Sequence, residues 1–519
     1  MPRLPHGSVI TIDQVRAARE VLAARSGDLP LAFAAIRPDD LQDFDFLFPG
    51  LQKDPGNLLL KSSETPARLA ALAQTMRDNN PGSPEGDSDI PAAYTYFGQF
   101  VDHDITLEAV SAPLPSLIDP NLTPLPLKEI RKRIRNARTA TLDLDSVYSA
   151  PAPRDGDKLR LGTVTALNGQ ALPVRRPPEK DDFNDLPREP GSDDPAHDRA
   201  ALTGDPRNDE NLIVGQLHVA FLRAHNKLID QGKSFNEART IIRQHYQHIV
   251  LQDFLRRIAD PQIVDRVFLH HNCVYNALDE PFFLPLEFSV AAYRLGHSMV
   301  RAAYNFNLNF NLSGAPGTVP ASLGLLFTFT ALSGQLGNFD TLPDNWIIQW
   351  ENIIDLGSST NVQKARRIDT QIVNPLFTLP DVQGAPEQGL AAVLAARNLL
   401  RGYLLRIPTG QAVASALSLE PLNASQIEEA AGSDDQRTAL RNGGFLDRTP
   451  LWYYILVEAA SQANGRHLGP VGSMIVAEVL TGLARRSKDS ILRQKCWKPT
   501  LPSAKKGAFT LADLLNFSF

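Results

Sequence analysis

Residues 92–110 read AAYTYFGQFVDHDITLEAV, and this stretch says most about the fold. Apolar and aromatic residues recur in it at helical spacing, so it predicts a helix around the triplet Asp102–His103–Asp104. Acidic side chains buried beside a histidine must be compensated by a cation, a covalent bond or hydrogen bonds. On its own, the triplet is also compatible with an ordinary helix surface. The segment therefore predicts a helix and makes His103 a candidate functional residue.

The composition is that of an ordinary globular protein. The chain has 519 residues, of which 43% are hydrophobic and 21% are charged, and this balance excludes wholesale disorder. A formal net charge of −6 gives no basic excess, so we expect no nucleic-acid partner. There are two cysteines, Cys273 and Cys496, which excludes a disulfide scaffold and a cysteine-rich zinc or iron–sulfur site.

Helical periodicity recurs along the chain, whereas strand-like alternation is scarce. The best strand candidate, residues 158–164, is short. Residues 150–206 are charged and proline-rich, and they are either a surface linker between domains or an excursion wrapped on a single domain. The sequence therefore predicts a mainly α-helical fold with long ordered loops. The predicted helices cover residues 12–25, 92–110, 211–231, 236–258, 288–304, 389–405, 450–463 and 471–485.

Two further segments carry candidate functional residues. His297 lies in YRLGHSMV, residues 293–300, where Gly296 would let a bulky group approach the backbone beside the imidazole. A hydrogen-bonded core histidine is the alternative. The sequence GDPRNDE, residues 204–210, precedes the predicted helix over 211–231 and places an arginine and a glutamate three residues apart. A capped helix start is the alternative for this segment.

Residues 139–148, TATLDLDSVY, are a candidate cation site. Oxygen-bearing side chains alternate with apolar residues at positions 139, 141, 143 and 145. In an extended loop this alternation points the oxygens to one side, and a hard cation such as calcium takes many oxygen ligands. A half-buried strand alternates in the same way and is the alternative. Two aspartates on the polar side favour the ion.

Taken in their order along the chain, these segments resemble the peroxidase–cyclooxygenase superfamily, the animal-type haem peroxidases that also occur in bacteria. The resemblance spans roughly residues 90–485 and includes RAHNKL, residues 223–228, and RNLLRG, residues 397–402. It implies a large helical haem peroxidase domain over 90–485 with little β-structure. An N-terminal extension over 1–89 would pack on this domain, and residues 486–519 would form a C-terminal tail. The cysteine-rich segments of animal members are missing, which suits a bacterial-type protein.

Carried over residue by residue, the resemblance implies haem b as the cofactor. His103 would be the acid–base on the distal side, where peroxide binds, and His297 would ligate the iron from the proximal side. The same segments assign the other residues of the haem site: Gln99 to distal water or a halide, Arg207 as the distal cation, Asn398 as the partner of His297, Arg401 to a haem propionate, and Arg294 to cofactor binding.

The resemblance also implies a calcium ion and covalent links to the haem. Asp102 and Glu210 match the two carboxylates that esterify haem methyl groups in mammalian members. Asn211 follows Glu210 where some members have the methionine of a third, sulfonium link, so we expect no such link. The implied calcium ligands are Asp104, Thr139, Thr141 through its backbone carbonyl, Asp143 and Asp145.

The implied activity is that of a haem peroxidase, which reduces hydrogen peroxide through a ferryl intermediate and oxidises a small organic or halide donor. A neutral imidazole can move a proton from one peroxide oxygen to the other, and an arginine can stabilise the charge that develops on the leaving oxygen. A haem-dependent fatty-acid dioxygenase of the same superfamily is the alternative. Its radical-forming tyrosine would lie three residues before the proximal histidine, where this chain has Arg294, with Tyr293 one residue out of register. A degenerate, non-enzymatic binding protein is a third hypothesis.

The N-terminus shows no Sec-type signal, since no apolar run with a small-residue cleavage site occurs there. The longest uncharged stretch, residues 302–339, has an apolar centre at 323–332 that is too short to span a bilayer. A buried core element is its expected role, and a membrane-leaning surface is the alternative. We expect no transmembrane segment, and a location in the cytoplasm or export by a non-Sec route.

Overall fold

Helices dominate the structure. The computed structural model describes residues 10–13, 41–149, 152–167, 182–193, 198–328, 339–357, 361–379 and 389–519, and most of the predicted helix over 12–25 lies outside them. The α-helices in the described part are α2 (Thr65–Thr75), α3 (Ala93–Ile105), α4 (Leu127–Arg133), α5 (Asp145–Tyr148), α6 (Leu212–Asp230), α7 (Phe235–His248), α8 (Leu255–Ile258), α9 (Pro261–His270), α10 (Gly296–Met299), α11 (Leu323–Thr328), α12 (Leu394–Leu404), α13 (Gly410–Ala416), α14 (Ala424–Glu429), α15 (Asp434–Gly443), α16 (Leu451–Ala463), α17 (Pro470–Arg486) and α18 (Leu511–Ser518).

The strands of the described residues are two to five residues long. One five-stranded sheet has the order β1-β4-β5-β2-β8, with parallel pairing of β1 with β4 and of β2 with β8. The others form two-stranded ribbons. Such short strands cannot show a period-two pattern, so the sequence did not reveal them. The strands are β1 (Ile10–Thr11), β2 (Gln42–Asp45), β3 (Asp87–Pro91), β4 (Glu108–Val110), β5 (Ile134–Asn136), β6 (Arg154–Asp155), β7 (Lys158–Leu159), β8 (Phe283–Pro285), β9 (Ala303–Tyr304), β10 (Ala321–Ser322) and β11 (Lys364–Arg366).

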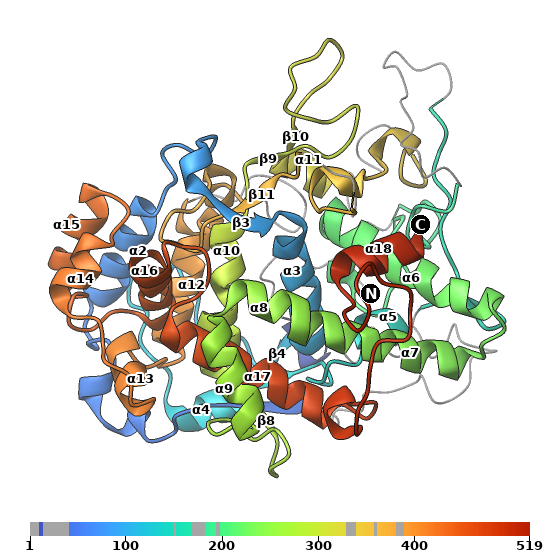
Figure 1. Cartoon of the computed structure of the whole chain (residues 1–519). Coiled ribbons are helices and arrows are strands. Elements are labelled where there is room, and N and C mark those ends of the chain that lie inside the picture. The colour runs from blue at the N-terminus through green and yellow to red at the C-terminus, as the bar shows by residue number, and fades with distance from the viewer. Residues whose placement is uncertain are drawn as a thin grey trace.

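Helix α3 lies in the middle of the molecule (Figure 1). Helices α2, α12, α14, α15 and α16 gather on one side of it, and α5, α6, α7 and α18 on the other. Phe100 of α3 stacks on Phe221 of α6 with ring centroids 4.9 Å apart, and both rings are buried. Each buried aromatic side chain of this kind contributes about 1.5–3 kcal/mol, so this contact holds α3 against α6.

Three predicted helices match the structure within about a residue. Helix α6 begins at the Asn211 cap, whose side chain accepts a hydrogen bond from the Val214 amide. The predicted helices over 211–231, 450–463 and 471–485 correspond to α6, α16 and α17.

Other predicted helices are shorter or interrupted. The helix expected over 92–110 ends at Ile105, and β4 follows it. The helix expected over 288–304 is wrong as a continuous element: a π-helical turn and a 3₁₀ turn precede the single turn of α10, and β9 follows. A π-helical turn interrupts 236–258, and 389–405 begins with a 3₁₀ turn. These helix types share similar spacing of apolar residues, so periodicity does not separate them.

The described parts of 150–206 lie on the core and not between two domains. Arg188 forms ion pairs with Asp185 and Asp209, and the side chains of all three residues are at most 5% exposed. The strand expected over 158–164 is reduced to β7, which pairs with β6. The interpretation of this segment as an excursion wrapped on the core therefore fits the structure.

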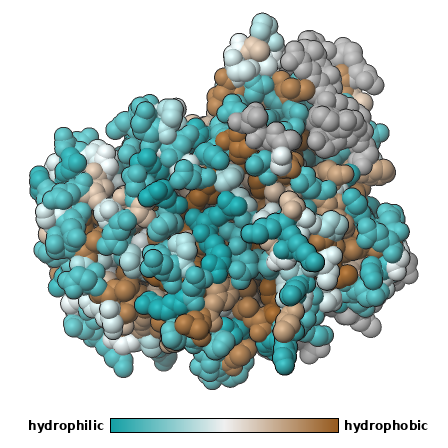
Figure 2. Space-filling view, in the orientation of Figure 1, coloured by the Kyte–Doolittle hydropathy of each residue, from teal (hydrophilic) through white to brown (hydrophobic). Residues whose placement is uncertain are grey.

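The described residues contain no helix long and apolar enough to cross a membrane. Figure 2 shows a mostly hydrophilic face on which apolar residues gather near the base of the loop between β9 and β10. This loop carries three exposed apolar side chains, Leu308, Leu312 and Val319. Scattered exposed apolar residues are common on proteins and define no site by themselves.

Candidate active site

Helix α3 carries four of the predicted site residues within two turns. Gln99, Asp102 and His103 lie at positions i, i+3 and i+4, so they share a face of the helix. Asp104 is directed instead to the loop before α5, where it accepts hydrogen bonds from the backbone amides of residues 144 and 146. One short helix therefore serves two sites.

His103 is buried and hydrogen-bonded. The residue is 2% exposed, and Nδ1 of its imidazole lies 2.9 Å from Oδ1 of Asn208. If Nδ1–H donates to this oxygen, Nε2 keeps the lone pair. Burial and the positive charge of Arg207 lower the pKa of His103, which favours the neutral imidazole.

Arg207 lies in a 3₁₀ turn that Asp205 caps. Its Nη2 donates to Oδ2 of Asp205 at 2.7 Å and to the backbone carbonyls of His103 and Thr106. Burial alone would raise the pKa of Asp205, but Arg138 and Arg207 lower it far below its usual range. The guanidinium of Arg207 is thus fixed beside the backbone of His103 by a permanently charged carboxylate.

Glycine at position 204 allows this segment to approach the loop before α5. A Cβ atom at Gly204 would lie 2.5 Å from the carbonyl oxygen of Asp145. Arg138 crosses the same contact: its Nη2 donates to the Gly204 carbonyl at 2.9 Å, and its guanidinium pairs with Asp145 and Asp205. The candidate calcium loop and the turn that holds Arg207 are therefore joined by buried charges.

Glu210 and Asn211 meet Gln99 across the interface of α3 and α6. Nε2 of Gln99 donates to Oε1 of Glu210, and Nδ2 of Asn211 donates to Oε1 of Gln99 at 3.0 Å. Since Asn211 also caps α6, the start of that helix positions the Gln99 amide.

His297 lies on the opposite side of the site, in the single turn of α10. The amide of Asn398, on α12, is 2.8 Å from Nδ1 of His297, and the ring of Trp452 meets the imidazole edge-on with centroids 6.4 Å apart. A Cβ atom at Gly296 would meet nothing within 4 Å, in line with the open space expected beside this residue. The structure thus brings together His297 and Asn398, 101 positions apart in the sequence.

Two predicted haem contacts pair with acids in this structure. Nη1 of Arg294 lies 3.5 Å from Oδ2 of Asp102, and Oδ1 of Asp102 accepts a hydrogen bond from the Thr106 hydroxyl. Arg401, expected at a propionate, pairs with Glu108 of β4. Burial lowers the pKa of Arg401 to about 10, which still leaves it charged at neutral pH.

A cavity separates the α3 side from the His297 side. Its enclosed volume is about 80 Å³, and the empty space is about 770 Å³ when the open solvent at its mouth is counted as well. Gln99, Asp102, Glu210, Arg294 and His297 all line it, together with apolar and aromatic residues that include Tyr96, Phe254, Tyr293, Leu323 and Phe327. His103, Arg207 and Asn398 lie behind this wall.

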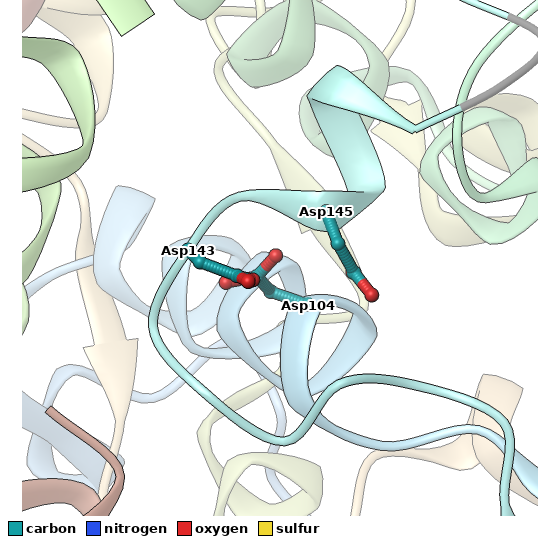
Figure 3. Close-up of side chains that lie close together, drawn as sticks. All are labelled: Asp104, Asp143 and Asp145. Atoms are coloured by element: carbon teal, nitrogen blue, oxygen red, sulfur yellow. The ribbon is translucent and has the colours of Figure 1, made fainter. Parts of the chain in front are cut away.

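The predicted calcium residues also come together. Oxygen atoms of Asp104, Asp143 and Asp145 lie within 4.8 Å of one another, and Figure 3 shows Asp104 and Asp143 directed toward each other below Asp145 of α5. Oγ1 of Thr139 lies 3.1 Å from Oδ1 of Asp143. Burial and the neighbouring carboxylates raise the pKa of Asp104, and burial raises that of Asp145 to about 6. Residues 139–144 belong to no strand, and the backbone bends at 141–143, so the strand alternative is wrong.

Sequence reasoning missed three residues that this geometry makes important. Asn208, read as a possible helix cap, is instead the partner of His103. Arg138 belongs to no motif of the sequence, although it directly precedes the candidate cation site at residues 139–148. Tyr293, set aside as out of register, lines the cavity. Each of the three acts through a partner remote in sequence, so no local pattern could have shown it.

The fold and the site define a member of the peroxidase–cyclooxygenase superfamily, a helical protein with His297 in the wall of a central cavity and His103 behind the opposite wall. A family model described as animal haem peroxidase matches residues 121–402, more than half of the sequence. The chain belongs to the animal haem peroxidase family, whose members typically bind haem.

Individual relatives agree with this membership. A peroxidase-like protein of Margaritifera margaritifera is 28% identical over 69% of the chain, which spans about half (49%) of that relative's length. Peroxidase A from Dictyostelium discoideum superposes with a TM-score of 0.54 at 17% identity, covering 81% of this chain and 83% of that chain. A fatty acid alpha-dioxygenase of Oryza sativa gives 0.54 at 12% identity, covering 89% and 78%. The structural likenesses show the fold, and the family and the names of its members indicate an oxidoreductase.

Proposed function

We propose that this protein is a haem peroxidase that reduces hydrogen peroxide and oxidises a small organic or halide donor. The observation that carries the proposal is the position of two hydrogen-bonded histidines about one cavity. His103, with Arg207 and Asn208, lies behind the wall that α3 forms, and the half-buried His297, backed by Asn398, lies in the opposite wall. A purely structural role would not require an acid–base histidine with a fixed cation next to it.

The residues around the cavity fit a haem. Apolar and aromatic side chains form most of its wall, as a flat macrocycle requires, and His297 enters it as a candidate iron ligand. Asn398 contacts the far nitrogen of that imidazole, as second-shell partners of metal ligands do. Arg294 supplies a cation at the wall for a propionate. When bound, haem supplies the iron at which peroxide is reduced and the donor oxidised.

The protein's own groups would manage the proton and the charge. Nε2 of His103 accepts a proton from peroxide and returns it to the leaving oxygen, while Nδ1–H keeps its bond to Asn208. Arg207, immobilised by Asp205, supplies positive charge where negative charge develops. Gln99 presents an amide to water or a halide from the wall of the cavity.

The proposal is tested by reconstituting the protein with haem and recording absorption spectra before and after one equivalent of hydrogen peroxide. The wild-type spectrum should change with peroxide and return when a donor is added. His103→Ala should keep its haem but react about 10²–10⁴-fold more slowly, because the positioned acid–base is lost. His297→Ala should instead lose haem or its native spin state. An unchanged peroxide rate in His103→Ala would overturn the assignment.

Tyr293 supports a second candidate, a haem-dependent fatty-acid dioxygenase. Its ring lines the cavity beside His297 and stacks on Phe288, and its hydroxyl lies 3.3 Å from the Gly98 carbonyl. A tyrosine in this place could form the radical that such chemistry needs. Oxygen uptake with linoleate, abolished by Tyr293→Phe, would establish the dioxygenase. Peroxide-dependent dye oxidation that survives Tyr293→Phe would establish the peroxidase.

We also propose a calcium ion between Asp104, Asp143 and Asp145, with Thr139 and the Thr141 carbonyl as further ligands. The buried carboxylates of Asp104 and Asp145 and the half-buried one of Asp143 repel one another at this distance, and a divalent cation would relieve the repulsion. Prolonged chelation should lower the melting temperature and the peroxidase rate together. If metal analysis shows calcium removed and neither quantity changes, the site is not a calcium site.

We propose further that Asp102 and Glu210 are the carboxylates available for ester links to haem, because both line the cavity. Acid–solvent extraction of peroxide-treated holoprotein tests this. Haem that stays with the wild-type protein but is extracted from an Asp102→Asn, Glu210→Gln double variant would support the links, and complete extraction from the wild type would exclude them.

A further inference from the structure

Behind His103 lies a row of three buried polar side chains. Nδ1 of His103 is 2.9 Å from Oδ1 of Asn208, and Nδ2 of Asn208 is 2.9 Å from Nδ1 of His218 on α6. The three residues are at most 2% exposed. Buried polar groups of this kind must satisfy one another, so their hydrogen bonds are coupled.

The amide of Asn208 can satisfy its neighbours in two ways. If Oδ1 faces His103, the imidazole carries its proton on Nδ1 and keeps a lone pair on Nε2. If the amide turns over, Nδ2 faces His103 and the proton must sit on Nε2. The first state makes Nε2 a base and the second makes it a donor. The orientation of one amide therefore selects the tautomer of His103.

Acid–base catalysis at Nε2 of His103 is compatible with the orientation in which Oδ1 of Asn208 faces Nδ1. After Nε2 takes a proton from peroxide, both ring nitrogens of His103 are donors. With Oδ1 facing it, Nδ1–H keeps an acceptor before and after the transfer, and the proton can return from Nε2 to the leaving oxygen. With Nδ2 facing it, two N–H donors would confront each other in a buried place, which costs the energy of an unmade hydrogen bond.

His218 gives the amide a reason to stay in the productive orientation. Burial lowers the pKa of His218 to about 3, so it is a neutral imidazole with one acceptor nitrogen. Its Nδ1 accepts from Nδ2 of Asn208, and Phe100 packs against the ring with centroids 6.3 Å apart. Because α6 is anchored by the Asn211 cap, the His218 ring is held on the far side of Asn208, where its Nδ1 faces Nδ2 of the amide.

We infer that Asn208 and His218 are positioning residues that hold His103 in the tautomer with a free Nε2. The inference deepens the proposed peroxidase function and rests on it for its kinetic consequence. The tautomer itself can be measured whether or not the protein reacts with peroxide.

The first measurement is direct. The reduced holoprotein with carbon monoxide bound is diamagnetic, and ¹⁵N-labelled histidine then reports by NMR which ring nitrogen of His103 carries the proton. We expect Nδ1–H in the wild type and a mixture or Nε2–H in Asn208→Leu. His218→Leu should give a mixture, because the Asn208 amide can then turn over. His225→Leu removes another buried histidine of α6, whose contacts are with Tyr148 and the Asp157 carbonyl, and should leave His103 unchanged.

The second measurement is the bimolecular rate with hydrogen peroxide. Asn208→Leu should fall about 10²-fold, the lower range of a positioned acid–base contribution. Asn208→Asp keeps an acceptor oxygen for Nδ1–H and should recover most of the rate, which a merely structural role would not explain. His218→Leu should fall less than Asn208→Leu, and His225→Leu should match the wild type.

The outcomes separate the two proposals. If the wild type does not react with peroxide but the variants shift the His103 tautomer, the function fails and the network stands. If the wild type reacts and Asn208→Leu and His218→Leu leave tautomer and rate unchanged, the network fails and the function stands. Should Asn208→Leu not fold, His218→Leu and Asn208→Asp carry the same test.

Discussion

Asn398 is the residue through which the fold acts on His297. Its amide lies 2.8 Å from Nδ1, so the nitrogen on the other side of the ring, Nε2, is the one that can ligate iron. In this structure Nδ2 of the Asn398 amide faces Nδ1. With Nε2 bound to iron, Nδ1 carries a proton and requires an acceptor, which the Asn398 amide provides when it turns its oxygen to the ring. A stronger acceptor makes the imidazole a better electron donor.

We therefore predict opposite shifts of the ferric/ferrous reduction potential for two Asn398 variants. Asn398→Asp should lower the potential, because a carboxylate stabilises the more electron-rich imidazole. Asn398→Leu should raise it and weaken haem retention about 10–100-fold. Spectroelectrochemical titration measures both. Trp452→Phe, which alters a ring on the edge of the same imidazole without touching Nδ1, should shift the potential less. Equal potentials in both Asn398 variants would contradict the prediction.

At the scale of elements, Arg138 joins the loop before α5 to the turn that holds Arg207. Its side chain is 3% exposed and pairs with Asp145 and Asp205, and Asp205 in turn fixes Arg207.

Removing one member of a buried ion-pair network leaves uncompensated charges and costs about 3–5 kcal/mol in the free energy of unfolding. We expect this loss in Arg138→Leu, measured by urea unfolding. Arg160→Leu is the matched control: its pair with Asp155 is exposed, so the loss should stay below about 1 kcal/mol. Equal losses would show that the buried network does not matter.

His245 ties the C-terminal segment to α7 in a pH-dependent way. Its Nδ1 lies 2.7 Å from the Ile241 carbonyl, and its Nε2 accepts hydrogen bonds from the backbone amides of Thr500 and Leu501. Burial lowers the pKa of His245 to about 4, with a smaller contribution from His248. Protonation would place an N–H on Nε2 against two amide donors.

The sign of the pH effect follows. The pKa of this imidazole is about 6.5 in the unfolded chain, so below that pH the unfolded state binds more protons. The stabilisation is complete above pH 6.5 and is lost as the pH falls toward 4, by about 3 kcal/mol at most. The hydrogen-exchange protection factors of the Thr500 and Leu501 amides, which correct for the intrinsic pH dependence of exchange, should therefore fall between pH 6.5 and 4. His245→Gln keeps an acceptor that does not titrate, so the fall should be smaller. The same pH dependence in this variant would refute the assignment.

The elements that the sequence predicts well are those whose signal is local. The motif of α3 and the 3₁₀ turn before α6 each hold their candidate residues within one or two turns, so Gln99, His103 and Arg207 could be proposed from the resemblance. The partners of these residues could not be named, because Asn208 meets His103 across 105 positions and Arg138 meets Asp205 across 67. Chemistry carried by one segment is visible in a sequence, whereas hydrogen-bond satisfaction between segments is not.

Local geometry limited the prediction in the same way around His297. The apolar spacing of 288–304 suggested one helix, but the backbone passes through π-helical and 3₁₀ turns before α10. Tyr293, one position away from the place of the family's tyrosine, lines the cavity together with His297. Irregular winding is common at functional sites, and it is invisible to a periodicity argument.

At the scale of the whole molecule, the segments outside the predicted domain of 90–485 pack on it. Helix α2 lies against α12 and α15, and α18 lies along α6. The division into an extension, a domain and a tail stays a prediction, and the contacts imply that the three form one cooperative unit. The amide of Leu511 donates to Asp253, which also accepts from Tyr94 of the core, and Oγ of Ser518 donates to the Ala220 carbonyl of α6.

We predict that deleting residues 486–519 leaves no stably folded protein. Four apolar side chains of this tail are at most 1% exposed: Phe509, Leu511, Leu514 and Leu515. Their burial contributes about 6–12 kcal/mol as an upper estimate, which matches the whole stability of a typical domain. Leu515→Ala should cost about 2–5 kcal/mol in urea unfolding, whereas Leu269→Ala, at a side chain that is 73% exposed, should cost less than about 0.5 kcal/mol. A deletion variant that unfolds at the wild-type temperature would show that the tail is an accessory and that α6 holds its half of the site without it.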